Sequence, residues 1–351
     1  MAHSHDEIFR QGAALIQTHK EVSEHAGEIR SLFDGVEEIV MVACGSSYWM
    51  SMSACMTIQE KTGIRCSSVK SGDVFLNPEH FRKAYRNPLV IAASRSGNTS
   101  ETLEAVRLFR ETYGSKVFGI TEYPEAAIAP LCDVLIRLPW ANETSVCQTR
   151  SFSNLYLACV LVAAIAGNDS ALAAELLDYA GEADLLADRA ELAIRHSVES
   201  FPQWNHLVGL GHGKQYGVCV EGVYIGIEMA QFPGNYYGTL EYRHGPIVTA
   251  DADTLVLVLC GEDKPALQGN VRLHEEKMAA DARAKGARVL SISDLVPLTD
   301  VDGAFAMGRK ASPEVIALYG VMIMQGFAYW KALAKGVDPD NPADLVPYIT
   351  L

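Results

Sequence analysis

Residues 89–102 read Leu-Val-Ile-Ala-Ala-Ser-Arg-Ser-Gly-Asn-Thr-Ser-Glu-Thr, an apolar run that enters a hydroxyl-rich turn. The apolar run 89–93 predicts a buried strand, and Leu103, Val106 and Phe109 predict an amphipathic helix after the turn. A helix N-terminus carries unpaired N–H groups and a partial positive charge, which attract anions. The turn therefore predicts a binding site for a phosphate monoester.

Side chains of the turn strengthen this prediction. Hydroxyl donors come from Ser94, Ser96, Thr99 and Ser100. Gly97 would let the backbone approach a ligand closely. The alternative is an ordinary N-cap, because serine and threonine before a helix commonly serve only as caps. The density of hydroxyls, and a second turn of this kind upstream, favour the anion site.

Composition limits the class of protein. The 351 residues are 49% hydrophobic and 21% charged, which is typical of a globular chain with room for two domain cores. A net charge of −14 without a basic cluster argues against a nucleic-acid surface. The longest apolar stretches, such as 155–166, are shorter than the roughly 20 residues that cross a bilayer. The polar N-terminus has no secretory signal pattern, so we expect a cytoplasmic protein without a membrane partner.

The sequence predicts no metal and no cofactor. The eight cysteines form no Cys-x-x-Cys pair, and the ten histidines show no metal-ligand spacing. The phosphate-binding pattern of P-loop nucleotidases is absent. Gly209, Gly211 and Gly213 resemble a dinucleotide loop only weakly, because their spacing is Gly-x-Gly-x-Gly and no acidic residue ends a following strand.

A repeat organises the chain. Residues 37–48 and 205–216, about 168 positions apart, each contain an apolar strand and a glycine turn that leads into an apolar helix. Further strands are predicted at 65–68, 89–93, 116–120, 133–137, 254–259 and 287–292. Strands that alternate with helices predict an α/β fold of two tandem doubly wound, flavodoxin-like units, with parallel sheets and helices on both faces.

The predicted domain boundaries follow from this repeat. They are a helical arm at 1–34, a first domain at 35–168, a helical linker at 169–200, a second domain at 201–335 and a tail at 336–351. The arm is expected to be one helix over 7–33, and further helices are expected at 100–112, 149–166, 265–285 and 313–335. Three prolines break the tail, so it is not expected to be helical.

Four motifs occur in an order that resembles a known family. They are Cys44–Tyr48, Ser94–Thr102, Glu143–Phe152 and Glu241–Pro246. Together they resemble the sugar isomerase (SIS) domain family, and most nearly the isomerase half of glucosamine-6-phosphate synthase and stand-alone phosphosugar isomerases and fructosamine-6-phosphate deglycases. The resemblance extends from about residue 35 to the tail and implies that the two units are SIS domains.

The resemblance also implies a phosphosugar site on the first unit. The phosphate would be held by Ser94, Ser96 and Thr99, with Arg95 where the family has a glutamine. The sugar would face Ser46 and Ser47, and the other wall would be formed by Val146, Gln148 and Thr149. Family members are dimers or larger, and His244 matches a histidine that reaches across an interface, so we expect a homo-oligomer.

A helix near 218–229 carries the candidate base. It is apolar except for Glu221 and Glu228, which lie seven residues apart and therefore share one face. Burial raises the pKa of a carboxyl, which suits a general base near neutral pH. The alternative is a structural carboxylate paired with Arg243 or Lys214.

The resemblance favours catalysis, since Glu228 lies sixteen residues before His244, as the family base does. It implies that Glu228 moves a proton between C1 and C2 and that His244 opens the sugar ring. Glu221 and Glu241 would support them.

Two departures from the pattern of the synthase narrow the range of expected reactions. Ile225 and Pro347 stand where the resemblance to the synthase would place lysines, and we expect no glutamine-hydrolysing domain. We therefore expect an isomerase or deglycase of a 6-phosphorylated amino sugar or ketosamine, without glutamine amidotransferase activity. The alternative is a non-catalytic phosphosugar-binding protein.

Overall fold

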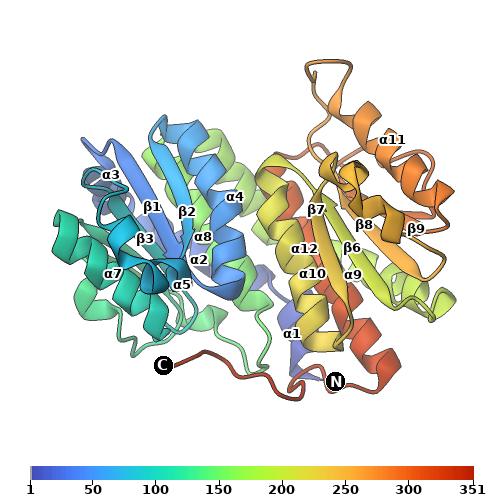
Figure 1. The fold of residues 1–351 in the computed structure, drawn as a ribbon, viewed down its shortest axis with the longest axis horizontal. Coiled ribbons are helices and arrows are strands. Elements are labelled where there is room, and N and C mark those ends of the chain that lie inside the picture. The colour runs from blue at the N-terminus through green and yellow to red at the C-terminus, as the bar shows by residue number, and fades with distance from the viewer. Residues whose placement is uncertain (1) are drawn as a thin grey trace. The chain divides into compact units, whose positions relative to one another are not determined.

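The computed structural model describes residues 2–351, which form two compact units (Figure 1). The N-unit comprises Gly12–Glu143, Arg150–Gly181 and Val346–Leu351. The C-unit comprises 2–11, Thr144–Thr149 and Glu182–Leu345. Each unit contains one five-stranded parallel sheet, so the predicted α/β class with two tandem parallel-sheet units is confirmed.

The N-unit sheet has the strand order β2-β1-β3-β4-β5. Its strands are β1 (Glu38–Ala43), β2 (Arg65–Lys70), β3 (Leu89–Ser94), β4 (Val117–Thr121) and β5 (Val134–Arg137). The chain winds outward in one direction from β1 to β2 and in the other from β3 to β5. Ligands of such sheets bind at the carboxyl ends of the strands where the winding reverses, which here is between β1 and β3.

Helices cover both faces of the N-unit sheet (Figure 1). They are α2 (Gly12–Glu24), α3 (Ala26–Phe33), α4 (Gly45–Thr62), α5 (Ser71–Leu76), α6 (Pro78–Phe81), α7 (Ser100–Tyr113), α8 (Arg150–Ala166) and the start of α9 (Ser170–Ser200). Alternate residues of a strand face opposite sides of a sheet. Val40 and Val42 of β1 accordingly pack in a core with Phe109 of α7.

The C-unit sheet repeats this winding in the order β10-β9-β8-β6-β7. Its strands are β6 (His206–Gly211), β7 (Gly234–Gly238), β8 (Thr254–Leu259), β9 (Arg288–Ser293) and β10 (Gly303–Ala306). Its helices are α1 (His3–Phe9), the later part of α9, α10 (Tyr216–Ala230), α11 (Val271–Ala284) and α12 (Pro313–Lys335). The corresponding switch point lies between β6 and β8.

Several sequence predictions need correction. The single helix predicted over 7–33 is wrong, because α1, α2 and α3 occupy this stretch. The helix predicted from 265 begins only at Val271, where the Asn270 side chain caps it by accepting a hydrogen bond from Leu273 N at 2.9 Å. The strands β7 and β10 were not predicted.

Candidate functional site

The loop Ser94–Thr99 connects the carboxyl end of β3 to the first turn of α7. Ser94 and Ser96 are buried within it, and each hydroxyl oxygen accepts a backbone hydrogen bond. Ser94 Oγ accepts from Gly97 N at 3.2 Å, and Ser96 Oγ accepts from Asn98 N at 3.1 Å. These bonds fold the loop back on itself, so its shape is fixed before any ligand binds.

Gly97 is required by the shape of this loop. Its φ of +63° lies in the left-handed region, which costs a residue with a Cβ about 1–2 kcal/mol. An added Cβ would also lie 2.7 Å from Ala126 Cβ and 3.0 Å from Thr121 Oγ1. The loop can therefore approach the segment after β4 only because residue 97 has no side chain.

The N-terminus of α7 is not capped by its own side chain. Thr99 occupies the N-cap position, but its hydroxyl makes no capping hydrogen bond to the helix. The ordinary-cap alternative therefore does not explain the Thr99 hydroxyl. At the neighbouring strand, Ser46 and Ser47 lie buried in the first turn of α4, directly after β1. The N-unit thus gathers two helix N-termini and several hydroxyls at its switch point.

Arg95 is buried, and its guanidinium contacts groups of the protein itself. Arg95 Nη2 donates to Pro347 O at 2.6 Å, and Nη1 lies 3.7 Å from Glu143 Oε1. The backbone oxygen of Arg95 accepts from Glu122 N at 3.0 Å. These contacts tie the loop to the end of β4 and to the tail, so a phosphate contact from Arg95 remains a prediction.

The tail segment Val346–Leu351 contacts the Ser94–Thr99 loop and the start of α7. Besides the contact of Pro347 with Arg95, Leu351 N donates to Ser100 Oγ at 3.0 Å. The rings of Tyr348 and Tyr123 meet edge to face with centroids 6.3 Å apart. The tail is therefore part of the surroundings of the predicted phosphate site.

Glu122 is a fully buried carboxyl behind the loop, directly after β4. Within residues 2–351, neither of its side-chain oxygens has a hydrogen-bond partner. Burial raises the pKa of Glu122 well above its ordinary value, and the charge of Glu143 adds to this, while Arg95 and Arg150 oppose it. Burial therefore favours the protonated, neutral form of this carboxyl. Glu122 was not predicted from the sequence, although its place directly after an apolar strand was an available signal.

We expect Glu122→Gln to stabilise the protein at neutral and higher pH. Above the ordinary glutamate value of 4.5 the unfolded chain loses the Glu122 proton while the folded protein keeps it, so the wild-type free energy of unfolding falls as pH rises. Glutamine has the same shape and cannot ionise. Melting temperatures of both proteins should converge near about pH 4 and separate towards about pH 8.

Glu104→Gln is the matched control, because Glu104 is an exposed residue of α7 beside Arg107. It should leave the pH profile of the melting temperature close to that of the wild type. A loss of stability in Glu122→Gln that grows with pH would show instead that Glu122 is ionised and held by the two arginines.

The wall residues predicted by the resemblance belong to the C-unit segment Thr144–Thr149. Val146 and Gln148 are half-buried, and Thr149 is buried. The side-chain oxygen of Gln148 is buried, and no group among residues 2–351 donates a hydrogen bond to it. Since buried acceptors are normally satisfied, a ligand hydroxyl is a suitable donor to Gln148.

The candidate base lies on α10 as predicted. Glu221 is fully buried and Glu228 half-buried. Glu221, Tyr224 and Glu228 are spaced three and four residues apart on α10 and therefore share one helical face. Burial raises the pKa of Tyr224 to about 12, and the charges of Glu228 and Glu221 add to this. Glu241 and His244 lie exposed in a 3-10 turn.

The cations proposed as structural partners of these glutamates face other carboxylates. Arg243 Nη2 lies 2.7 Å from Asp281 Oδ2, and Lys214 Nζ lies 2.8 Å from Glu314 Oε1. Each of these cations thus has a carboxylate partner on another element.

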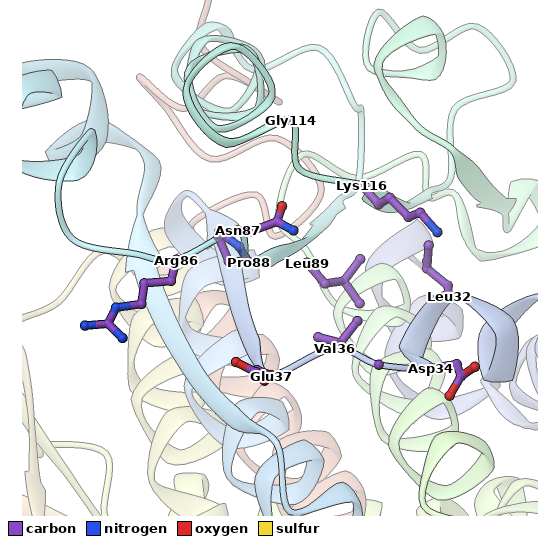
Figure 2. Close-up of a pocket in the computed structure, with 11 residues that line it drawn as sticks. Leu32, Asp34, Val36, Glu37, Arg86, Asn87, Pro88, Leu89, Gly114 and Lys116 are labelled. Atoms are coloured by element: carbon purple, nitrogen blue, oxygen red, sulfur yellow. The ribbon is translucent and has the colours of Figure 1, made fainter.

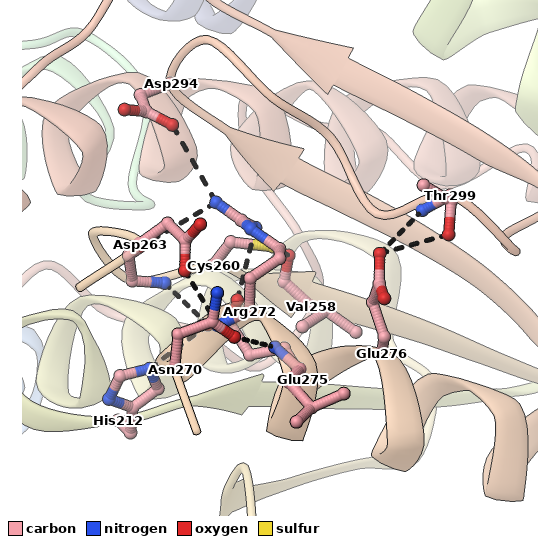
Figure 3. Close-up of polar contacts among 12 residues, drawn as sticks. His212, Val258, Cys260, Asp263, Asn270, Arg272, Glu275, Glu276, Asp294 and Thr299 are labelled. Atoms are coloured by element: carbon pink, nitrogen blue, oxygen red, sulfur yellow. Dashed lines mark hydrogen bonds and ion pairs between the residues drawn. The ribbon is translucent and has the colours of Figure 1, made fainter. Parts of the chain in front are cut away.

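The switch point of the C-unit is built differently (Figure 3). Glu275 Oε1 accepts a hydrogen bond from Gly261 N at 2.7 Å and lies 3.1 Å from His212 Nε2. Arg272 Nη1 lies 3.1 Å from Glu275 Oε2 and Nη2 lies 3.8 Å from Asp294 Oδ1. A carboxylate of the chain thus occupies the turn after β8, the counterpart of the Ser94–Thr99 loop after β3.

A cavity of about 380 Å³ opens at the other end of the N-unit strands (Figure 2). It lies beside the starts of β1 and β3, and its charged lining residues are Asp34, Glu37, Arg86 and Lys116. None of the predicted site residues lines it. Within residues 2–351 no group of three or more histidine, cysteine, aspartate or glutamate side chains could hold a metal ion. No described helix combines the length and the apolar character that crossing a membrane requires.

Comparison with known proteins finds a likeness to one domain family. Residues 33–166 match the model of the SIS domain. It is 26% identical to glutamine–fructose-6-phosphate aminotransferase [isomerizing] of Xylella fastidiosa over 98% of this chain and 58% of that protein. The chain therefore spans little more than half the length of this relative.

Two solved structures share the fold. The C-terminal domain of glucosamine-fructose-6-phosphate aminotransferase from Francisella tularensis has a TM-score of 0.81 at 20% identity, covering 97% of this chain and 98% of that one. Glucosamine-6-phosphate deaminase from Thermotoga maritima has a TM-score of 0.76 at 23% identity, covering 95% and 99%. The chain thus resembles the isomerase half of the aminotransferase and stand-alone phosphosugar enzymes.

Proposed function

We propose that this protein is an isomerase or deglycase of a 6-phosphorylated amino sugar or ketosamine, and that the reaction uses no glutamine. The Ser94–Thr99 loop would hold the phosphate. The observation that carries the proposal is the preorganised loop itself, in which hydroxyls and a helix N-terminus without a side-chain cap meet at the N-unit switch point.

The proposed chemistry assigns one proton transfer to each of two groups. Glu228 would take a proton from one of the sugar carbons C1 and C2 and return it to the other, through an enediol or enolamine. His244 would assist ring opening at the ring oxygen. Ser46 and Ser47 would bind the sugar, with Val146, Gln148 and Thr149 opposite, while Glu221 and Glu241 would support the catalytic pair. A homo-oligomer with His244 near an interface remains part of the proposal.

Names of the similar proteins support the substrate class. One acts on fructose 6-phosphate and isomerises, and another is a deaminase of glucosamine 6-phosphate. Either reaction requires a base that moves a proton beside a carbonyl or imine carbon. Ile225 and Pro347 cannot form an imine with the sugar, so the proposed reaction depends on the carboxylate and the histidine alone.

A substrate panel tests this proposal. The purified protein is incubated in deuterated buffer with hexose, ketose, amino-sugar and fructosamine 6-phosphates, and products are followed by NMR together with assays for ammonia and free amino acids. We expect one class of compound to incorporate deuterium or release its amine. Saturable binding without any reaction would favour the phosphosugar-binding alternative, and neither binding nor reaction would refute both.

A further inference from the structure

Glu7 of α1 holds the segment Thr144–Thr149, although 137 residues separate Glu7 from its start. Glu7 Oε1 accepts from Thr144 N at 2.6 Å and from Ser145 N at 3.4 Å. Glu7 Oε2 accepts from the Ser145 hydroxyl. The Glu7 side chain is buried, so little water competes for these hydrogen bonds.

Asp340 connects the start of α1 to the same segment. Its carboxylate accepts from His3 N, Ser4 N and Ser4 Oγ at 2.8, 2.8 and 2.7 Å. Its backbone oxygen accepts from Val146 N at 2.9 Å. Partial burial acts to raise the pKa of Asp340, yet the hydrogen bonds from Ser4 and His3 outweigh it and the pKa is lowered. Asp340 therefore remains ionised and holds α1 in place.

Gln325 of α12 fixes the other end of the segment. Gln325 Nε2 donates to Thr149 O at 3.1 Å, and Gln325 Oε1 accepts from Gln11 Nε2 at 3.3 Å. The backbone is thus held at both ends. Gln148 stands between these points, and its buried amide oxygen accepts no hydrogen bond from residues 2–351.

We infer that Glu7 is a positioning residue, which with Asp340 and Gln325 fixes the segment 144–149 so that Gln148 can accept a hydrogen bond from a sugar hydroxyl. This inference rests on the proposed function for the identity of the ligand. It assigns Gln148 to the sugar rather than to the phosphate. The contacts of Glu7 determine whether the Gln148 oxygen is presented in one fixed place.

Hydrogen–deuterium exchange tests the positioning without any substrate. In Glu7→Ala the amides of 144 and 145 should exchange at least about tenfold faster, because their acceptor is lost. Glu7→Gln retains an oxygen for both amides and should largely restore protection. Glu191→Ala is the matched control. Glu191 contacts His5, which lies on α1 as Glu7 does, and its hydrogen bond does not involve the segment 144–149. If the amides of residues 144 and 145 exchange in Glu7→Ala at the wild-type rate, the inference is overturned.

Binding measurements then test the consequence for the ligand. With the sugar phosphate that the panel identifies, affinity should fall about fivefold or more in Glu7→Ala and recover in Glu7→Gln, whereas affinity for inorganic phosphate should not change. An equal loss for both ligands would refute the assignment to the sugar. If the wild type binds no sugar phosphate, the proposed function fails while the exchange experiment still decides the role of Glu7. Should Glu7→Ala not fold, Ser145→Ala removes the hydroxyl donor to Glu7 and is expected to show the same effects more weakly.

Discussion

Glu228→Gln should abolish turnover of any substrate found in the panel, lowering kcat by about 10²- to 10⁴-fold, the range expected for loss of a general base. Glutamine keeps the shape and polarity of the side chain but cannot accept the proton. The substrate should still bind, because the phosphate contacts lie in the Ser94–Thr99 loop. Deuterium exchange into bound sugar should disappear together with product formation.

The controls separate a lost base from a disturbed fold. Glu262→Gln removes an exposed carboxylate of the same unit and should leave kcat unchanged. Glu228→Asp keeps a carboxylate on a shorter side chain and should retain part of the activity. Full activity in Glu228→Gln at unchanged affinity would refute the assignment of the base while leaving the phosphate site intact.

The double change Ser96→Ala and Thr99→Ala should weaken phosphosugar binding by at least about a hundredfold. Each hydroxyl would donate a charge-assisted hydrogen bond to the phosphate, and such bonds contribute about 1.5–3 kcal/mol each. Ser96→Ala also removes the acceptor for Asn98 N, which would loosen the loop further. Calorimetry with the sugar phosphate and with inorganic phosphate measures both effects.

A serine outside the loop provides the matched control. Ser115 is buried in the same unit between α7 and β4, so Ser115→Ala should leave the affinity unchanged. The kcat of the double variant at saturating substrate should fall far less than its affinity, since neither hydroxyl takes part in proton transfer. Unchanged affinity for both ligands would exclude the Ser94–Thr99 loop as the phosphate site.

The sequence was sufficient for elements whose signals are local. The strand predicted at 89–93 is β3 (Leu89–Ser94), because an apolar run buried on both faces needs no other information. The two edge strands of the C-unit, β7 and β10, were missed for the converse reason. Gly234–Gly238 and Gly303–Ala306 are short and carry few of the branched residues that mark a strand, and pairing with β6 and β9 determines their conformation.

Site residues divide in the same way. The position of Ser94 and Thr99 between a strand and a helix could be predicted because strand, turn and helix follow one another in the chain. Glu7 could not, because its partners lie 137 residues away and only the fold brings them together. The contacts of Arg95 were likewise hidden, since they depend on Glu143 and on Pro347 of the tail. No local pattern in the sequence shows that this buried guanidinium contacts groups of its own chain.

Glu275 has a consequence for stoichiometry. The two sheets wind alike, and from topology alone each unit would bind one phosphate ester. In the C-unit, however, the carboxylate of Glu275 already accepts the Gly261 amide and lies against Arg272. A titration with a sugar phosphate should therefore saturate at one equivalent per polypeptide, because the C-unit has no corresponding phosphate site.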